Sequence, residues 1–108
     1  MINVIAVTSC ATGIAHSYMA AEAIKKLGKK NGWKVRIEIQ GAMGVEDRLK
    51  SGEIEGADVL VLANDVGLTD GERFDSLKAR TISMTPHSVI QSPDNLASKV
   101  QALVEQGA

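Results

Sequence analysis

The feature that most constrains this chain is an alternation of short apolar runs with segments of helix length. Runs that fit β-strands occur at Ile2 to Val7, Val35 to Ile39, Ala57 to Ala63 and, more weakly, Thr81 to Met84. Strands that alternate with helices form right-handed crossover units, which place successive strands parallel in one sheet. The sequence therefore predicts an α/β fold with a four-stranded parallel sheet.

The pattern within each run predicts its place in the sheet. The first and third runs are almost continuously apolar, as expected for strands covered by helices on both faces. The second run alternates, which predicts that Lys34, Arg36 and Glu38 are exposed to water, and the short fourth run follows Arg80. We therefore expect an open doubly wound sheet of order 2-1-3-4 with helices on both faces, edges at the second and fourth strands, and a ligand site where strands 1 and 3 diverge.

The most regular helical pattern follows the first run. Apolar residues at a spacing of four, with Ala20 and Ile24 beside them, predict its buried stripe: Ala15, Met19, Ala23 and Leu27. The pair Asn31-Gly32 suits a left-handed cap and predicts the end of this helix. A short helix is expected over Val45 to Lys50, another begins at Thr85-Pro86, and Pro93 to Gln106 reads as the closing helix.

Composition excludes several classes of protein. The chain has 108 residues, 44% of them apolar, which predicts one domain over residues 1–108 with its own core. The net charge is −1 and the lysines cluster only locally, so no nucleic-acid-binding surface is expected. The first apolar run is too short for a membrane span and lacks the flanks of a signal peptide, so we expect a cytoplasmic protein without membrane insertion. Met1 and the tail Gln106-Gly107-Ala108 favour a free-standing subunit.

Candidate chemistry concentrates in the segment between the first strand and the first helix, Thr8-Ser9-Cys10-Ala11-Thr12-Gly13-Ile14-Ala15-His16-Ser17. Backbone N–H groups from about Ala11 to Ser17, with Gly13 permitting close approach, are expected to form a nest for an anion such as a phosphoryl group. The same field should lower the pKa of the Cys10 thiol below its ordinary value of about 8.5, which makes Cys10 a nucleophile rather than an inert small hydrophobe. One cysteine and two histidines are too few for a disulfide or a structural zinc site, so no metal or cofactor is predicted.

Polar side chains in this segment have two readings each. Ser9, Thr12 and Ser17 either donate hydroxyl hydrogen bonds to the anion or serve as helix caps. His16 either donates to thiolate or phosphoryl oxygens or is simply a polar residue of the first helical turn. The spacing C-x5-H-S differs by one position from the C-x5-R-[ST] loop of low-molecular-weight tyrosine phosphatases, in which the arginine grips the phosphate. Because His16 stands in place of that arginine, transfer of a phosphoryl group is favoured over its hydrolysis.

The residues from Cys10 to Ala23, C-A-T-G-I-A-H-S-Y-M-A-A-E-A, closely resemble the phosphorylation loop and first helix of fructose-type enzyme IIB components of the bacterial phosphotransferase system. The usual form there is C-P-T-G-I-A-H-[ST]-x-M-A-A-E, so Ala11 replaces a proline. Further matches follow in order: Glu38-Ile39-Gln40-Gly41 where the family usually has E-T-Q-G, Ala57-Asp58 leading to Ala63-Asn64-Asp65, and Arg73-Phe74. The resemblance spans most of the chain.

This resemblance implies a protein-N(pi)-phosphohistidine–sugar phosphotransferase with a phosphocysteine intermediate. Cys10 would accept a phosphoryl group from a phosphohistidine of enzyme IIA and pass it to a sugar bound by the membrane-embedded enzyme IIC. The residues implied to hold the phosphoryl group are Ala11, Thr12, Gly13, Ile14, Ala15, His16 and Ser17. The implied reaction needs no cofactor in this chain.

Loops at the carboxyl ends of the strands are expected to surround Cys10 and to dock both partners. The docking candidates are Gln40, Gly41, Asp65 and Arg73. Arg73 alternatively pairs with a neighbouring carboxylate, and Asp65 is alternatively a structural turn residue. Two other functions stay open from the residues alone: a phosphatase or arsenate-reductase-like hydrolase that uses the same cysteine loop, and a non-catalytic binding module.

Overall fold

The fold is described from a computed structural model, for residues 2–9, 14–41, 44–64 and 71–107. The strands are β1 (Asn3–Ser9), β2 (Lys34–Gly41), β3 (Gly44–Glu46), β4 (Val59–Asn64) and β5 (Thr81–Met84). The helices are α1 (Ile14–Asn31), α2 (Ser51–Glu55), the 3-10 helix η1 (Gly71–Arg80), α3 (Pro86–Gln91) and α4 (Pro93–Gly107).

The strands form a five-stranded sheet of order β3-β2-β1-β4-β5. β2, β1, β4 and β5 pair in parallel, which confirms the predicted order 2-1-3-4. The fifth strand was not predicted: β3 pairs antiparallel with the carboxyl end of β2, joining Gly41 to Gly44 in register. β2 is therefore covered at that end and is not a simple edge strand. The predicted helix over Val45 to Lys50 is wrong: β3 covers the start of this segment, and α2 begins at Ser51. A strand of three residues is too short to give a periodic signal in the sequence.

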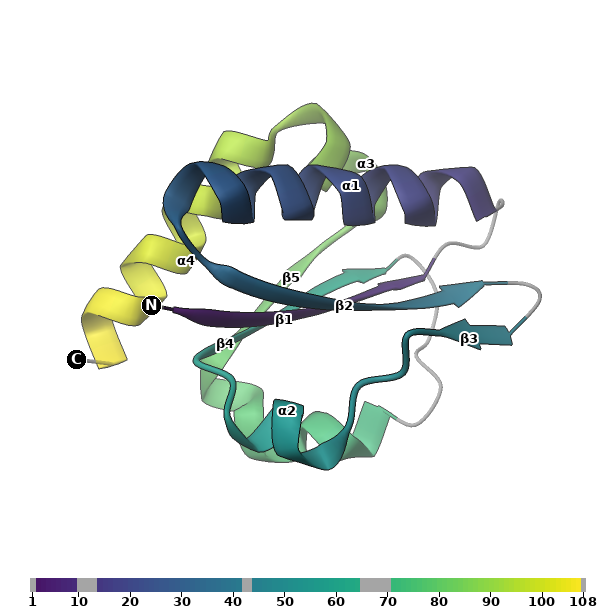
Figure 1. The fold of residues 1–108 in the computed structure, drawn as a ribbon. Coiled ribbons are helices and arrows are strands. Elements are labelled where there is room, and N and C mark those ends of the chain that lie inside the picture. The colour runs from purple at the N-terminus through teal and green to yellow at the C-terminus, as the bar shows by residue number, and fades with distance from the viewer. Residues whose placement is uncertain (1, 10–13, 42–43, 65–70, 108) are drawn as a thin grey trace.

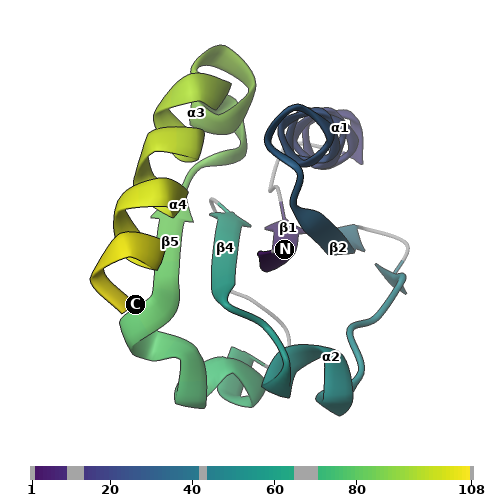
Figure 2. The same ribbon diagram turned by 60° about the vertical axis from the view of Figure 1, so that its left-hand side comes forward.

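Helices cover both faces of the sheet, as predicted (Figures 1 and 2). α1, α3 and α4 lie on one face, and α2 and η1 lie on the other. Successive residues of a strand point to opposite faces, so Val4 and Ala6 of β1 join the core under α1, whereas Ile5 and Val7 join the core under α2 and η1. The central strands are thus buried on both sides. None of the helices in the described ranges is long and apolar enough to cross a membrane.

The buried stripe of α1 differs from the predicted one. Ala20, Ile24 and Leu27 are buried as expected, but Met19 is 51% exposed, as is its neighbour Tyr18 at 41%. α1 approaches the sheet closely at Gly28, where an added Cβ would come within 2.5 Å of Val35 Cγ2. The core under this helix is filled by Ala20, Ile24 and Leu27, and Met19 lies outside it.

Two local signals for helix ends are confirmed. Gly32 follows α1 with φ +73°, the left-handed conformation expected of this cap. Thr85 caps α3 by accepting a hydrogen bond from Ser88 N, and Pro86 is the first residue of that helix.

Candidate functional site

The candidate site lies at the carboxyl edge of the three central strands. Ser9, the last residue of β1, is in register with Gln40 of β2 on one side and Asn64 of β4 on the other. The chain then passes through residues 10–13 into α1, which begins at Ile14. β1 and β4 are the two strands between which the doubly wound sheet diverges, and ligand sites in such sheets lie at this position.

Several predicted site residues lie outside the described residues. These are Cys10, Ala11, Thr12, Gly13 and Asp65. Of the remaining residues predicted to hold a phosphoryl group, Ile14, Ala15, His16 and Ser17 form the first turn of α1. The structure therefore positions both ends of the predicted loop: a central strand enters it and a helix N-terminus follows it.

Two buried hydroxyl groups near this loop have no hydrogen-bond partner among the described residues. They are Thr8 Oγ1 of β1, with the residue 0% exposed, and Ser17 Oγ of α1, with the residue 1% exposed. A buried hydroxyl without a partner costs about 1–3 kcal/mol, so native proteins keep few of them. Ser17 belongs to the predicted phosphoryl-binding segment, where an unused donor is what an anion would require.

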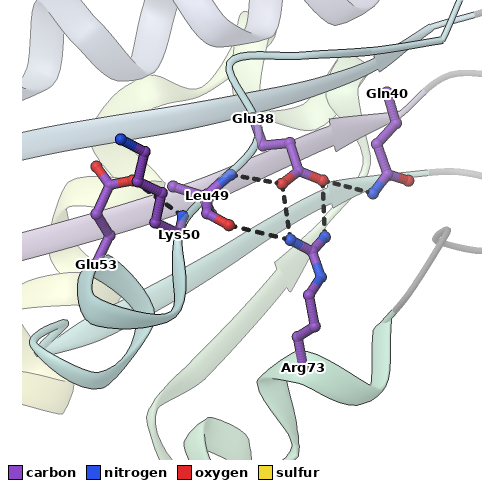
Figure 3. Close-up of polar contacts among 6 residues, drawn as sticks. All are labelled: Glu38, Gln40, Leu49, Lys50, Glu53 and Arg73. Carbon is purple, nitrogen blue, oxygen red and sulfur yellow. Dashed lines mark hydrogen bonds and ion pairs between the residues drawn. The ribbon is translucent and has the colours of Figure 1, made fainter.

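A second polar cluster lies on the face of the sheet covered by η1 (Figure 3). Glu38 of β2 is fully buried, and Arg73 of η1 grips its carboxylate with two hydrogen bonds. Arg73 Nη2 donates to Oε2 at 2.8 Å and Nη1 donates to Oε1 at 3.0 Å. The guanidinium also lies over the Phe74 ring, 4.8 Å from its centroid. This bidentate geometry is the strong form of an arginine–carboxylate pair.

Two further donors complete the shell of Glu38. The Gln40 Nε2 group donates to Oε2 at 2.8 Å, and the backbone N–H of Leu49 donates to Oε1 at 2.8 Å. Arg73 Nη1 additionally donates to the Leu49 carbonyl oxygen at 3.4 Å. The cluster therefore ties together β2, the segment before α2, and η1.

Burial and hydrogen bonding act in opposite directions on the carboxyl group of Glu38. Burial raises its pKa, but the hydrogen bonds from Arg73, Gln40 and Leu49 and the positive charge of Arg73 outweigh that effect. The resulting pKa lies below the ordinary value of a glutamate. Glu38 is therefore ionised at neutral pH and paired with a charged Arg73.

This cluster corrects one prediction and confirms another. Glu38 was expected on a water-exposed face of the second strand, yet it is 0% exposed because η1 brings Arg73 over it. The alternative reading of Arg73, that it pairs with a neighbouring carboxylate, is confirmed. The short matches Glu38-Ile39-Gln40-Gly41 and Arg73-Phe74 were the sequence signals for this cluster, and neither showed that Glu38 and Arg73 would meet.

Among the docking candidates, Gln40 is 7% exposed and held by Glu38, and Arg73 is 18% exposed at its side chain. Gly41 is the last residue of β2, at the carboxyl edge of the sheet. The structure therefore brings Gln40 and Arg73 into one cluster. Their role in docking stays a prediction.

Fold and site together define a class of protein: an open doubly wound α/β domain whose candidate ligand edge is formed by the carboxyl ends of β1, β2 and β4. Residues 5–99 match the family model described as "PTS system, Lactose/Cellobiose specific IIB subunit". The chain belongs to this family of IIB components. Membership gives it the role of a sugar phosphocarrier component in that system.

Similar proteins place the chain with the fructose type. Over 108 residues, 100% of both chains, it is 36% identical to the PTS system fructose-like EIIB component 2 of Escherichia coli strain K12. A crystal structure of a predicted fructose-specific IIB from Escherichia coli superimposes with a TM-score of 0.90 at 38% identity, covering 96% of this chain and 90% of that one. A third relative is the PTS system 2-O-alpha-mannosyl-D-glycerate-specific EIIABC component of Escherichia coli strain K12. The two sequences are 40% identical over 80 residues, which cover 74% of this chain and 12% of the relative.

Proposed function

We propose that Cys10 carries the phosphoryl group. The observation that supports this most directly is positional: Cys10 follows Ser9, which ends the central strand β1 between Gln40 and Asn64, and α1 begins four residues further on. Backbone N–H groups at a helix N-terminus bind anions, and the same field favours a thiolate. The unpartnered hydroxyl of Ser17 adds a side-chain donor in the first turn of α1.

The reaction is two successive in-line displacements at phosphorus. The Cys10 thiolate supplies the electron pair for a new S–P bond while the N–P bond of a phosphohistidine on enzyme IIA breaks, and the histidine nitrogen keeps that bond's electrons. In the second step a sugar hydroxyl oxygen attacks phosphorus, the S–P bond breaks, and Cys10 leaves as a thiolate. The hydroxyl proton passes to a base on the sugar-binding partner or to water.

The partners proposed are enzyme IIA as donor and membrane-embedded enzyme IIC, with its bound sugar, as acceptor. A relative whose name combines A, B and C components in one protein supports such an arrangement. A carrier that meets both a donor and a membrane-bound acceptor works in the cytoplasm, and we propose that location. The proposed chemistry uses no cofactor of this chain, because the cysteine itself forms the covalent intermediate.

The structure favours the carrier over the hydrolase that shares its cysteine loop. In the phosphatase loop an arginine grips the phosphate, and here His16 occupies that position. η1 brings Arg73 over the face of the sheet that holds Glu38. Both terminal nitrogens of Arg73 donate hydrogen bonds to the buried carboxylate of Glu38. An arginine neutralised in this way contributes little to stabilising a hydrolytic transition state.

A chromogenic phosphomonoester such as p-nitrophenyl phosphate separates the two functions. The carrier proposal expects no turnover above the level of Cys10→Ser, because nothing releases the phosphoryl group to water at a useful rate. Repeated turnover that disappears in Cys10→Ser would instead identify the protein as a hydrolase.

A further inference from the structure

The buried Glu38–Arg73 pair lies close to the candidate site along β2, because Glu38 precedes Gln40 by two residues on that strand. Parallel pairing places Glu38 in register with Val7, and Gln40 in register with Ser9, the residue before Cys10. Residues in register share a face, so Glu38 and Gln40 lie on the same face as Val7 and Ser9. Arg73 reaches this face from η1 (Figure 3).

The charge of Glu38 determines which end of the Gln40 amide faces it. An ionised carboxylate only accepts hydrogen bonds, so the amide must turn its NH₂ group toward Glu38. The observed contact, Gln40 Nε2 to Glu38 Oε2 at 2.8 Å, has this orientation. Figure 3 shows the amide oxygen of Gln40 on the side away from Glu38. A neutral residue at position 38 would not enforce that choice, since a neutral amide can both donate and accept.

We propose that the Glu38–Arg73 ion pair serves phosphoryl transfer by holding the amide of Gln40, the β2 residue in register with Ser9, in this one orientation, which makes Gln40 a positioning residue of the site. The proposal rests on the phosphocarrier function proposed above. A carbonyl oxygen attracts N–H donors and repels phosphoryl oxygens. In this proposal Gln40 orients N–H or O–H donors at this edge of the sheet and does not contact the phosphoryl group.

Stability alone is a poor explanation for this cluster. Replacing a buried ion pair with apolar residues of similar volume is often neutral or stabilising, so a fold gains little from burying one. The same strand also carries an ion pair that is not buried. Arg36, on the same face, makes an exposed pair with Glu53 at 3.3 Å, with the Arg36 side chain 64% exposed. The fully enclosed carboxylate of Glu38, with four donor contacts, fixes the orientation of those donors, which an exposed pair does not.

The test is the rate at which Cys10 is phosphorylated by a phosphorylated fructose-type enzyme IIA, followed in single turnovers by intact mass at several IIA concentrations. The variants are Gln40→Leu, Glu38→Gln and the double variant, with Arg36→Gln as the matched control on the same strand. Thermal unfolding of each variant is recorded in parallel, so that loss of rate is separated from loss of folded protein.

We expect Gln40→Leu to lower the maximal rate roughly tenfold or more without changing the IIA concentration at half-maximal rate, since misplaced groups slow the chemical step. Glu38→Gln should also lower the rate, and the double variant should be no slower than Gln40→Leu although it is less stable. This dependence of one effect on the other is a readout that a structural role would not give. Arg36→Gln should transfer at the wild-type rate.

Three outcomes overturn the proposal and leave the carrier function standing. A wild-type maximal rate in Gln40→Leu would exclude a positioning role, and a raised half-maximal IIA concentration alone would make Gln40 a docking residue. Rate losses that multiply in the double variant would show that Glu38 acts independently of Gln40. If Glu38→Gln fails to fold, the comparison of Gln40→Leu with Arg36→Gln still decides. A wild-type chain that gains no phosphoryl group would instead refute the carrier function, and with it this proposal.

Discussion

Glu38 is a carboxylate with no exposed surface, held by donors from three separate parts of the chain. Its partners compensate for the lost hydration, and its pKa falls below the ordinary value despite burial. Removing the charge of Glu38 takes from Arg73, whose side chain is 18% exposed, the carboxylate that its guanidinium grips. The contribution of Glu38 to the free energy of unfolding therefore depends on pH.

The sign of that pH dependence follows from the lowered pKa. A carboxyl group whose pKa is lower in the folded state stabilises the fold above its unfolded pKa of about 4.3, and this contribution is lost as pH falls through the folded pKa. We expect Glu38→Gln to lower the free energy of unfolding by about 3 kcal/mol at pH 7, because it breaks a buried pair. The gap between wild type and variant should narrow on acidification below about pH 4.3.

Urea unfolding from pH 7 to pH 3 measures this gap. Arg36→Gln, which breaks the exposed pair with Glu53, is the control and should cost at most about 1 kcal/mol at neutral pH. A Glu38→Gln variant whose gap to wild type stays constant across the acid range would show that the charge of Glu38 does not carry the stabilisation.

At the scale of elements, α1 lies close enough to β2 that one glycine is required. A Cβ at position 28 would meet Val35 Cγ2 at 2.5 Å, and the branched Val35 side chain has little freedom to move. We expect Gly28→Ala to destabilise the protein by about 1 kcal/mol or more, because overpacking outweighs the helix propensity gained.

Gly52 in α2 is the matched control for this prediction. An added Cβ there meets nothing within 4 Å, so Gly52→Ala should stabilise the protein by up to about 1 kcal/mol. Thermal unfolding of the two variants measures both effects. A Gly28→Ala variant as stable as Gly52→Ala would contradict the close approach of α1 to β2.

Local signals account for the elements that the sequence predicted correctly. The apolar runs that became β1 and β4, the cap at Gly32 and the start of α3 at Thr85 are each determined by residues close together in the chain. The strand order followed because only right-handed crossovers join such strands.

The errors share a different origin. Glu38 pairs with a residue 35 positions away, so the alternation within β2 wrongly predicted that its side chain is exposed to water. Met19 fits the predicted stripe of α1, but the face that meets the sheet runs through Ala20, Ile24 and Leu27. β3 depends on pairing with β2 rather than on its own three residues. Of the candidate site, the proposed nucleophile Cys10 came from a local motif, whereas the Glu38–Arg73–Gln40 cluster required the tertiary structure.

At the scale of the whole molecule, the candidate site lies at one edge of the sheet. The carboxyl ends of β1, β2 and β4 bring Ser9, Gln40 and Asn64 into register, and α1 starts from the same edge. The opposite edge, where Asn3 pairs with Lys34, is separated from it by the length of the strands. A carrier that must meet a donor and an acceptor at one cysteine can therefore use one surface for both encounters in turn.

The central claim is that Cys10 holds the phosphoryl group between those encounters. Its most direct measurement is the intact mass of the chain after incubation with phosphoenolpyruvate, the general phosphotransferase proteins and a fructose-type enzyme IIA. We expect one phosphoryl group per wild-type chain and none on Cys10→Ser, since the chain has no other thiol. A phosphoryl group that appears equally on Cys10→Ser would contradict the claim.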